Sequence, residues 1–90
     1  MGKYVLIYYF DVWGNAKDGW EVNNQCTEFD DLMISDDASE KEILEYLVSI
    51  KFLATSDRRR VRIDMNSYAD AMEIYEVKGL KPLASLRRVA

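Results

Sequence analysis

The segment KYVLIYYFDVW, residues 3–13, constrains the fold of this chain more than any other part of the sequence. It is rich in β-branched and aromatic residues and contains neither glycine nor proline, a composition typical of a β-strand. Successive strand residues point to opposite faces of a sheet, so Leu6 and Tyr8 share one face while Ile7 and Tyr9 share the other. Both faces are mostly apolar, which predicts a central strand whose second face is covered by loops or by a partner.

Turn and capping signals divide the rest of the chain. The segment GNAKDG at 14–19 contains the residues that turns use, and it predicts a hairpin into a second strand. Ser39 followed three residues later by Glu42 forms a capping box, and an apolar stripe at helical spacing follows it. The predicted elements are a strand over 3–13, a strand over 19–28, a short extended segment over 30–35, a helix over 40–53, and strands over 59–65, 71–77 and 83–89.

The segment 67–77 fits two structures. The spacing of Tyr68, Ala71 and Met72 suits a helix, whereas EIYEV at 73–77 has the composition of a strand. Gly79 and Pro82 suit a hairpin turn into the last segment, so we interpret 71–77 as a strand. The predicted fold class is α+β: a single domain over residues 1–90, an antiparallel sheet of four to five strands with one helix packed on one face, in the order β-β-α-β-β-β.

Few residues of this chain can carry catalytic or metal chemistry. The sequence has no histidine, which excludes a Ser-His or Cys-His pair, and a single cysteine argues against the usual transition-metal sites. No glycine-rich phosphate-binding motif occurs in it. We therefore expect a non-enzymatic protein without a cofactor or a metal site, in which Cys26 is a buried, unreactive thiol.

The charge is unevenly distributed along the chain, whose net charge is −4. Residues 1–45 hold 11 acids and 3 bases, whereas residues 46–90 hold 5 acids and 9 bases. Such asymmetry suggests a charged partner, although charges that offset each other within the fold would produce the same pattern. The residues predicted to bind a partner, through an acidic surface and the 14–20 loop, are Asn15, Asp18, Trp20, Asp30, Asp31, Asp36, Asp37 and Glu40.

A basic run at 58–62 supports an alternative hypothesis. Clustered arginines bind phosphates and tyrosines on a sheet can stack on bases, so the run is a candidate nucleic-acid interface. A solvated edge strand whose charges deter aggregation explains the same run without a ligand. The candidate nucleic-acid-binding residues are Arg58, Arg59, Arg60 and Arg62, and the residues of the same strand expected to face the core are Val61, Ile63 and Met65.

Both tryptophans of the chain flank the hairpin turn. Trp13 and Trp20 are expected to face each other across the base of the hairpin, which would add about 0.5–1.5 kcal/mol beyond burial. Asn15 and Gly19 are expected to adopt the left-handed conformations of the turn. A rigid hairpin of this kind also presents its tip to a partner, so the structural and the binding interpretations are compatible.

The stretch YYFDVWGNAKDGWEVNN, residues 8–24, resembles the start of a group of small phage and prophage proteins. Such proteins open with a strand, the sequence DVWGN, a loop, and then glycine, an aromatic residue and EVN. The resemblance is strongest over residues 4–24, and the helix start DASEKEIL and the ending GLKPLASLRRV are compatible with it. It implies a phage-type context, in which small acidic proteins often inhibit or redirect a host protein, and it implies no catalytic residue.

The leading hypothesis is a non-enzymatic protein-binding module, a phage-type inhibitor or regulator of a host protein that acts through its acidic surface. The alternatives are a small nucleic-acid-binding protein and a structural or assembly subunit. The two apolar faces of one strand also predict a homodimer. No segment approaches the roughly 18 apolar residues of a membrane span, and the expected location is the cytoplasm of a bacterial host.

Overall fold

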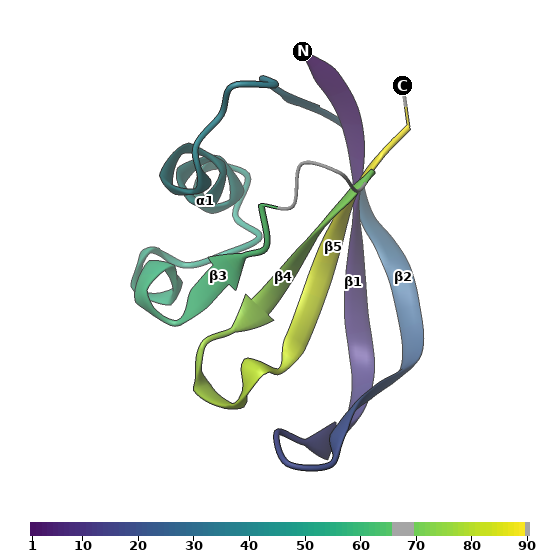
Figure 1. Cartoon of the computed structure of the whole chain (residues 1–90). Coiled ribbons are helices and arrows are strands. Elements are labelled where there is room, and N and C mark those ends of the chain that lie inside the picture. Colours follow the sequence, from purple (N-terminus) through teal and green to yellow (C-terminus); the bar gives the residue numbers. More distant parts are fainter. Residues whose placement is uncertain (66–69, 90) are drawn as a thin grey trace.

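The computed structural model describes residues 1–65 and 70–89. It has one five-stranded antiparallel sheet and one α-helix, which confirms the predicted α+β class (Figure 1). Within the described residues, no helix is long and apolar enough to cross a membrane. The elements are β1 (Gly2–Asn15), β2 (Gly19–Ile34), α1 (Glu40–Ser49), the 3-10 helix η1 (Thr55–Arg59), β3 (Val61–Ile63), β4 (Ala71–Glu76), the 3-10 helix η2 (Lys78–Leu80) and β5 (Pro82–Arg88).

The strand order in the sheet is β2-β1-β5-β4-β3, so neighbours in the sheet are not always neighbours in the chain. β1 lies between β2 and the last strand, β5, and it is antiparallel to both. β1 is therefore an interior strand, as predicted. The two edges of the sheet differ greatly, because β2 has 16 residues and β3 has three.

β1 and β2 form a long hairpin whose turn extends beyond the other strands, at the bottom of Figure 1. The predicted strand over 19–28 and the extended segment over 30–35 are parts of one strand, β2. Its pairing with β1 shifts at four places, and within one of them Asp31 has a φ of 58°. Such bulges bend a strand and increase its twist, which lets β2 follow β1 along its whole length.

α1 begins as the sequence predicts. The Ser39 hydroxyl accepts a hydrogen bond from the Glu42 backbone N–H, and the Glu42 carboxylate accepts one from the Ser39 N–H, which confirms the capping box. Its apolar stripe packs against one face of the sheet and closes the hydrophobic core. The core residues are Leu6, Leu32, Ile34, Ile43, Leu44, Leu47, Leu53, Val61, Ile63, Ile74, Ala84 and Leu86.

α1 ends earlier than the predicted residue 53. The helix stops at Ser49, and Lys51 adopts a left-handed conformation with a φ of 66°. The backbone N–H groups of Phe52 and Leu53 then donate to the Leu47 carbonyl, a closing pattern typical of helix ends. This turn returns Leu53 to the core and packs Phe52 against it, which a helix continued to 53 would not do.

The C-terminal half differs from the prediction in its first strand. β3 covers only Val61–Ile63, because the arginines before it belong to η1, and Met65 is 41% exposed instead of facing the core. β4 settles the ambiguous segment as a strand over 71–76, while Tyr68 lies outside the described residues. The predicted hairpin turn into the last strand is present, with Gly79 in η2 at a φ of 74°.

The second face of the sheet is covered by its own side chains, a solution that the sequence did not predict. Ile7 and Tyr9 are only 8% and 7% exposed on this face, and Ser85 between them and β4 is fully buried. The Tyr9 hydroxyl reaches across β5 and donates to the Glu73 carboxylate over 2.8 Å. Long strand residues such as Tyr9 therefore shield part of this face.

Candidate interaction surfaces

The tip of the β1–β2 hairpin is held by Asn15. Its side-chain oxygen accepts hydrogen bonds from the backbone N–H groups of Lys17 and Asp18, at 3.0 and 2.8 Å. The expected left-handed conformation is present at Gly19, with a φ of 99°, but not at Asn15. Gly14 adopts it instead, with a φ of 116°. Only glycine fits at this position, because a Cβ would lie 2.2 Å from the Gly19 carbonyl oxygen. Residues 14–19 of the tip are exposed.

The two tryptophans do not face each other. Trp13 pairs with Glu21 across the hairpin, its side chain is 65% exposed, and its indole N–H donates to the Asp11 carboxylate. The indole N–H of Trp20 donates to the Gly79 carbonyl over 2.8 Å. The predicted tryptophan pair is thus wrong: Trp20 ties the hairpin to η2, a long-range contact that hairpin spacing alone does not reveal.

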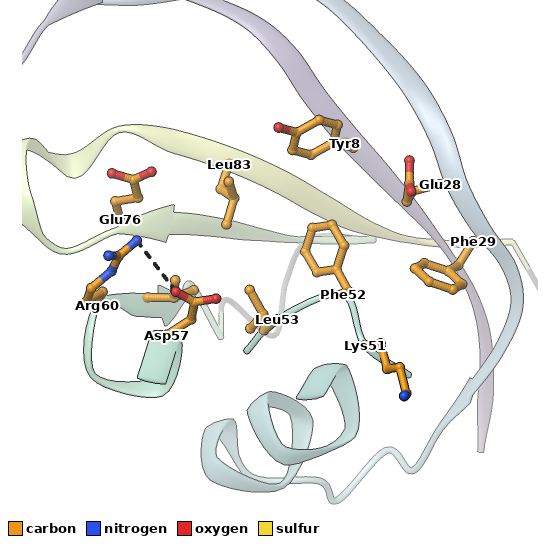
Figure 2. Close-up of a pocket in the computed structure, with 11 residues that line it drawn as sticks. Tyr8, Glu28, Phe29, Lys51, Phe52, Leu53, Asp57, Arg60, Glu76 and Leu83 are labelled. Carbon is orange, nitrogen blue, oxygen red and sulfur yellow. Dashed lines mark ion pairs between the residues drawn. The ribbon is translucent and has the colours of Figure 1, made fainter. Parts of the chain in front are cut away.

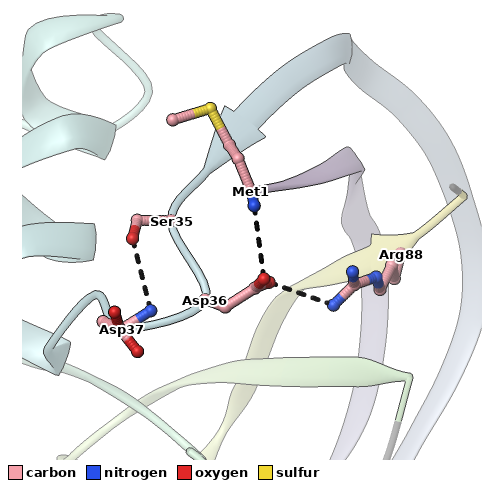
Figure 3. A network of polar contacts seen from close by, with 5 residues as sticks. All are labelled: Met1, Ser35, Asp36, Asp37 and Arg88. Atoms are coloured by element: carbon pink, nitrogen blue, oxygen red, sulfur yellow. Dashed lines mark hydrogen bonds and ion pairs between the residues drawn. The ribbon is translucent and has the colours of Figure 1, made fainter.

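Asp36 joins the two ends of the described chain (Figure 3). Its carboxylate lies 3.2 Å from the Met1 amino group and 3.2 Å from the Arg88 guanidinium. The hydrogen-bonded ammonium group, with a smaller contribution from Arg88, holds the pKa of the Asp36 carboxyl below its usual value. The charge of this predicted partner-binding residue is therefore largely compensated within the fold.

Other predicted acidic residues also have intramolecular roles. Asp31 pairs with Lys3 at 2.7 Å and raises the pKa of that amine. The Glu40 carboxylate accepts the backbone N–H of Ile63 over 3.0 Å. Asp30 and Asp37 are exposed, and neither forms an ion pair within the described part of the chain. The hairpin tip lies at the opposite end of the molecule from these acids, so they do not form one surface with it (Figure 1).

The four arginines of the basic run do not form a strand face. Arg58 and Arg59 belong to η1, Arg60 caps it, and only Arg62 lies in β3. Arg58 pairs with Glu45 at 3.8 Å, and Arg60 pairs with Asp57 at 3.5 Å. Arg62 donates to the backbone carbonyls of Arg58 and Val61. Much of the positive charge is directed to groups of the protein itself, which weakens the case for a phosphate-binding surface.

The two edges of the sheet are protected to very different degrees. β3 is short, and the Glu40 carboxylate occupies the outward N–H of Ile63. β2 is long and mostly exposed, although Leu32 and Ile34 at its end are buried in the core, and no other described strand pairs with its outer side. Cys26 lies in this strand and is exposed, so the predicted buried thiol is wrong. β2 carries Glu21, Glu28, Asp30 and Asp31 and no lysine or arginine.

A pocket of about 340 Å³ lies between the sheet and the turn after α1 (Figure 2). Three aromatic rings line it, and the Phe52 ring packs edge to face against Tyr8 and Phe29, at centroid distances of 6.1 and 6.4 Å. The aliphatic side chains of Leu53, Val61 and Leu83 complete its apolar surface. We name this cavity the aromatic pocket.

Charged side chains surround the aromatic pocket: Glu28, Lys51, Asp57, Arg60 and Glu76. Arg60 is paired with Asp57. Neither Glu28 nor Glu76 forms an ion pair within the described residues. In Figure 2 these two carboxylates lie on opposite sides of the pocket, and the Lys51 amine points away from it.

A second, more open groove of about 750 Å³ lies on the other face of the sheet, beside Tyr9. Val22, Tyr75, Leu80 and Pro82 form much of its wall. Burial raises the pKa of the Tyr9 phenol, and its hydrogen bond to Glu73 raises it further. The neutral phenol is therefore the stable form, and it acts as a fixed donor to Glu73.

Comparison of the chain with protein-family models, with curated proteins and with solved structures gave no match. The geometry of the chain itself must therefore support any functional conclusion.

The residues that build the strongest sites were not singled out from the sequence. The aromatic pocket combines residues of all five strands and of η1 with the turn after α1. The one sequence feature that indicates the pocket is Phe52, an apolar residue directly after the helix stripe. The predicted helix over 40–53 included this residue and so hid its role in the turn. The protection of β3 by Glu40 depends on a contact across 23 residues of sequence, and no local pattern encodes it.

Proposed function

We propose that this chain is a non-enzymatic protein-binding module that receives an extended segment of a basic partner protein along the free edge of β2. The single observation that supports this proposal is the asymmetry of the sheet edges. One edge is short and capped by Glu40, whereas the other presents a long exposed strand. Natural proteins protect such edges by shortening, covering, charging or bulging them. β2 carries acids and bulges but is neither short nor covered, so another strand of suitable charge can add to it.

The charge of β2 favours a particular kind of partner. The strand carries four acids and no base, and only Asp31 among them forms an ion pair within the described residues. Main-chain hydrogen bonds would supply the affinity of strand addition, and the acids would attract lysines and arginines and repel acidic segments. In the phage-type context that the N-terminal resemblance implies, the partner would be a host protein.

The proposal is tested by capture from bacterial lysate followed by amide hydrogen exchange on the purified complex. Amides of β2 should gain protection when the partner binds, because they acquire new hydrogen bonds. Protection confined to other elements, capture of nucleic acid, or self-association alone would contradict it. The last two outcomes would instead favour a nucleic-acid-binding protein or an assembly subunit.

A pair of charge variants tests the role of the acids. Glu21→Lys with Asp30→Lys should slow association strongly, and the loss should shrink as salt screens the charges over about 8–10 Å. Asp64→Lys with Asp70→Lys makes the same change in net charge away from β2 and serves as the matched control. Equal effects of the two pairs would show that net charge, and not the β2 edge, governs binding.

A further inference from the structure

We propose that the aromatic pocket is a receptor for the side chain of an arginine. The source of that arginine, the basic partner, rests on the proposed function, whereas the chemistry of the pocket does not. The inference deepens the proposed function by naming the residue type that anchors the partner.

The size of the aromatic pocket suits a single side chain. Its volume is about 340 Å³, at the lower end of the range of small-molecule sites. Glu28 and Phe29 line it and belong to β2, so the pocket borders the strand of the proposed binding edge. A partner lying along β2 therefore passes close to it.

The apolar surface of the pocket suits a planar cation. Tyr8, Phe29 and Phe52 supply aromatic rings, whose faces attract cations electrostatically. Leu53 and Leu83 supply aliphatic surface for the methylene stem of a long side chain. A guanidinium group stacks on aromatic rings and is more weakly hydrated than an ammonium group, so arginine should bind better than lysine.

The charge of the pocket rim selects a cation over an anion. Glu28 and Glu76 form no ion pair within the described residues, and they approach the pocket from opposite sides (Figure 2). Arg60, a competing cation at the pocket, is 3.5 Å from Asp57 and pairs with it. A guanidinium group in the pocket therefore has two lining carboxylates, Glu28 and Glu76, to pair with.

The probe for this proposal is N-acetyl-arginine amide, titrated into the ¹⁵N-labelled chain by NMR. We expect saturable shifts confined to residues of the pocket, with a dissociation constant on the order of 1 mM for so small a ligand. N-acetyl-citrulline amide has nearly the same shape without the charge and should bind at least tenfold more weakly. Equal binding of the two ligands, or shifts spread over the surface, would overturn the proposal.

Three variants should change the affinity for the arginine probe in different directions. Glu28→Gln with Glu76→Gln should weaken arginine binding about fivefold or more, and Arg60→Gln should tighten it about two- to fivefold by removing the competing cation. Glu21→Gln with Asp64→Asn makes the same charge change outside the pocket and should leave binding unchanged. Unchanged binding in the first variant, or weaker binding in Arg60→Gln, would refute the proposal, provided that the spectra show folded protein.

The two proposals fail separately. The β2 variant Glu21→Lys with Asp30→Lys alters no residue of the pocket, so it should block partner uptake and leave binding of the arginine probe intact. If wild-type protein binds the partner but not the arginine probe, the pocket proposal is refuted and the edge proposal stands. If it binds the probe but no partner along β2, the edge proposal is refuted and the pocket proposal stands.

Discussion

The two tryptophans should contribute very unequally to stability. Trp13 is 65% exposed and its indole N–H donates to the neighbouring Asp11 carboxylate, whereas Trp20 is half-buried and donates to a backbone carbonyl 59 residues away. Trp20→Ala removes a large aromatic contact and leaves the Gly79 carbonyl without this donor, so it should cost about 2–4 kcal/mol. Trp13→Ala should cost less than about 1 kcal/mol, as expected for surface substitutions.

These values predict a clear difference in thermal unfolding. For a domain of this size, each kcal/mol lowers the Tm by about 4–8 °C, so a cost of about 2–4 kcal/mol should lower the Tm of Trp20→Ala by about 8–32 °C. Circular dichroism at 222 nm during heating and urea titration measures both variants with the same probe. Each variant retains one tryptophan, so fluorescence independently reports whether the remaining indole is exposed.

The reasoning fails if the two substitutions cost the same, or if Trp13→Ala costs more. That result would mean that Trp13 packs against the domain in solution and that the contact between Trp20 and Gly79 adds little. Trp20→Phe refines the test, because it keeps most of the aromatic surface and removes the hydrogen bond. Its expected cost is about 1–2 kcal/mol.

Three further perturbations test other parts of the structure. Glu40→Ala leaves the Ile63 N–H without its acceptor and should cost about 1–3 kcal/mol in urea unfolding, while Glu40→Gln should recover much of this loss and Lys41→Ala should change little. The fold lowers the pKa of Asp36, so the stabilising contribution of this carboxylate is complete above its pKa in the unfolded chain and is lost as the pH falls through its pKa in the folded protein. Asp36→Asn should therefore flatten the fall in Tm below about pH 4. An unchanged dependence of Tm on pH would refute the Asp36 network. Cys26 is exposed, so folded protein should react with Ellman's reagent as fast as urea-unfolded protein within about tenfold, whereas a thiol that reacts only on unfolding would contradict its position in β2.

The parts of the fold that follow local rules could be predicted from the sequence. The capping box at Ser39 places the start of α1 correctly, because both of its hydrogen bonds close within four residues. The apolar composition of 3–13 correctly indicates an interior strand, and the glycine near the last turn correctly indicates a hairpin. Each of these signals acts over a short stretch of chain.

Two of the wrong predictions depend on contacts or pairings between distant segments. Trp20 turns toward Gly79 and not toward Trp13. Cys26 looked buried because its neighbours suggested an ordinary strand, but β2 is an outer strand. Strand order decides which residues are exposed, and no local pattern in this chain encodes that order.

The position of β5 in the middle of the sheet has a consequence for how the protein is completed during synthesis. β5 is the last strand to be made, yet it joins β1 on one side and β4 on the other. Until it arrives, the β1–β2 hairpin and the β3–β4 pair share no hydrogen bonds within the sheet. Pairings such as Tyr8 with Ala84 connect nearly opposite parts of the chain, and such pairings slow folding and prolong the exposure of apolar surface. A nascent chain therefore lacks Leu86, the partner of Leu6 in the sheet, until β5 has emerged, and a premature stop before β5 would split the sheet in two instead of trimming its edge.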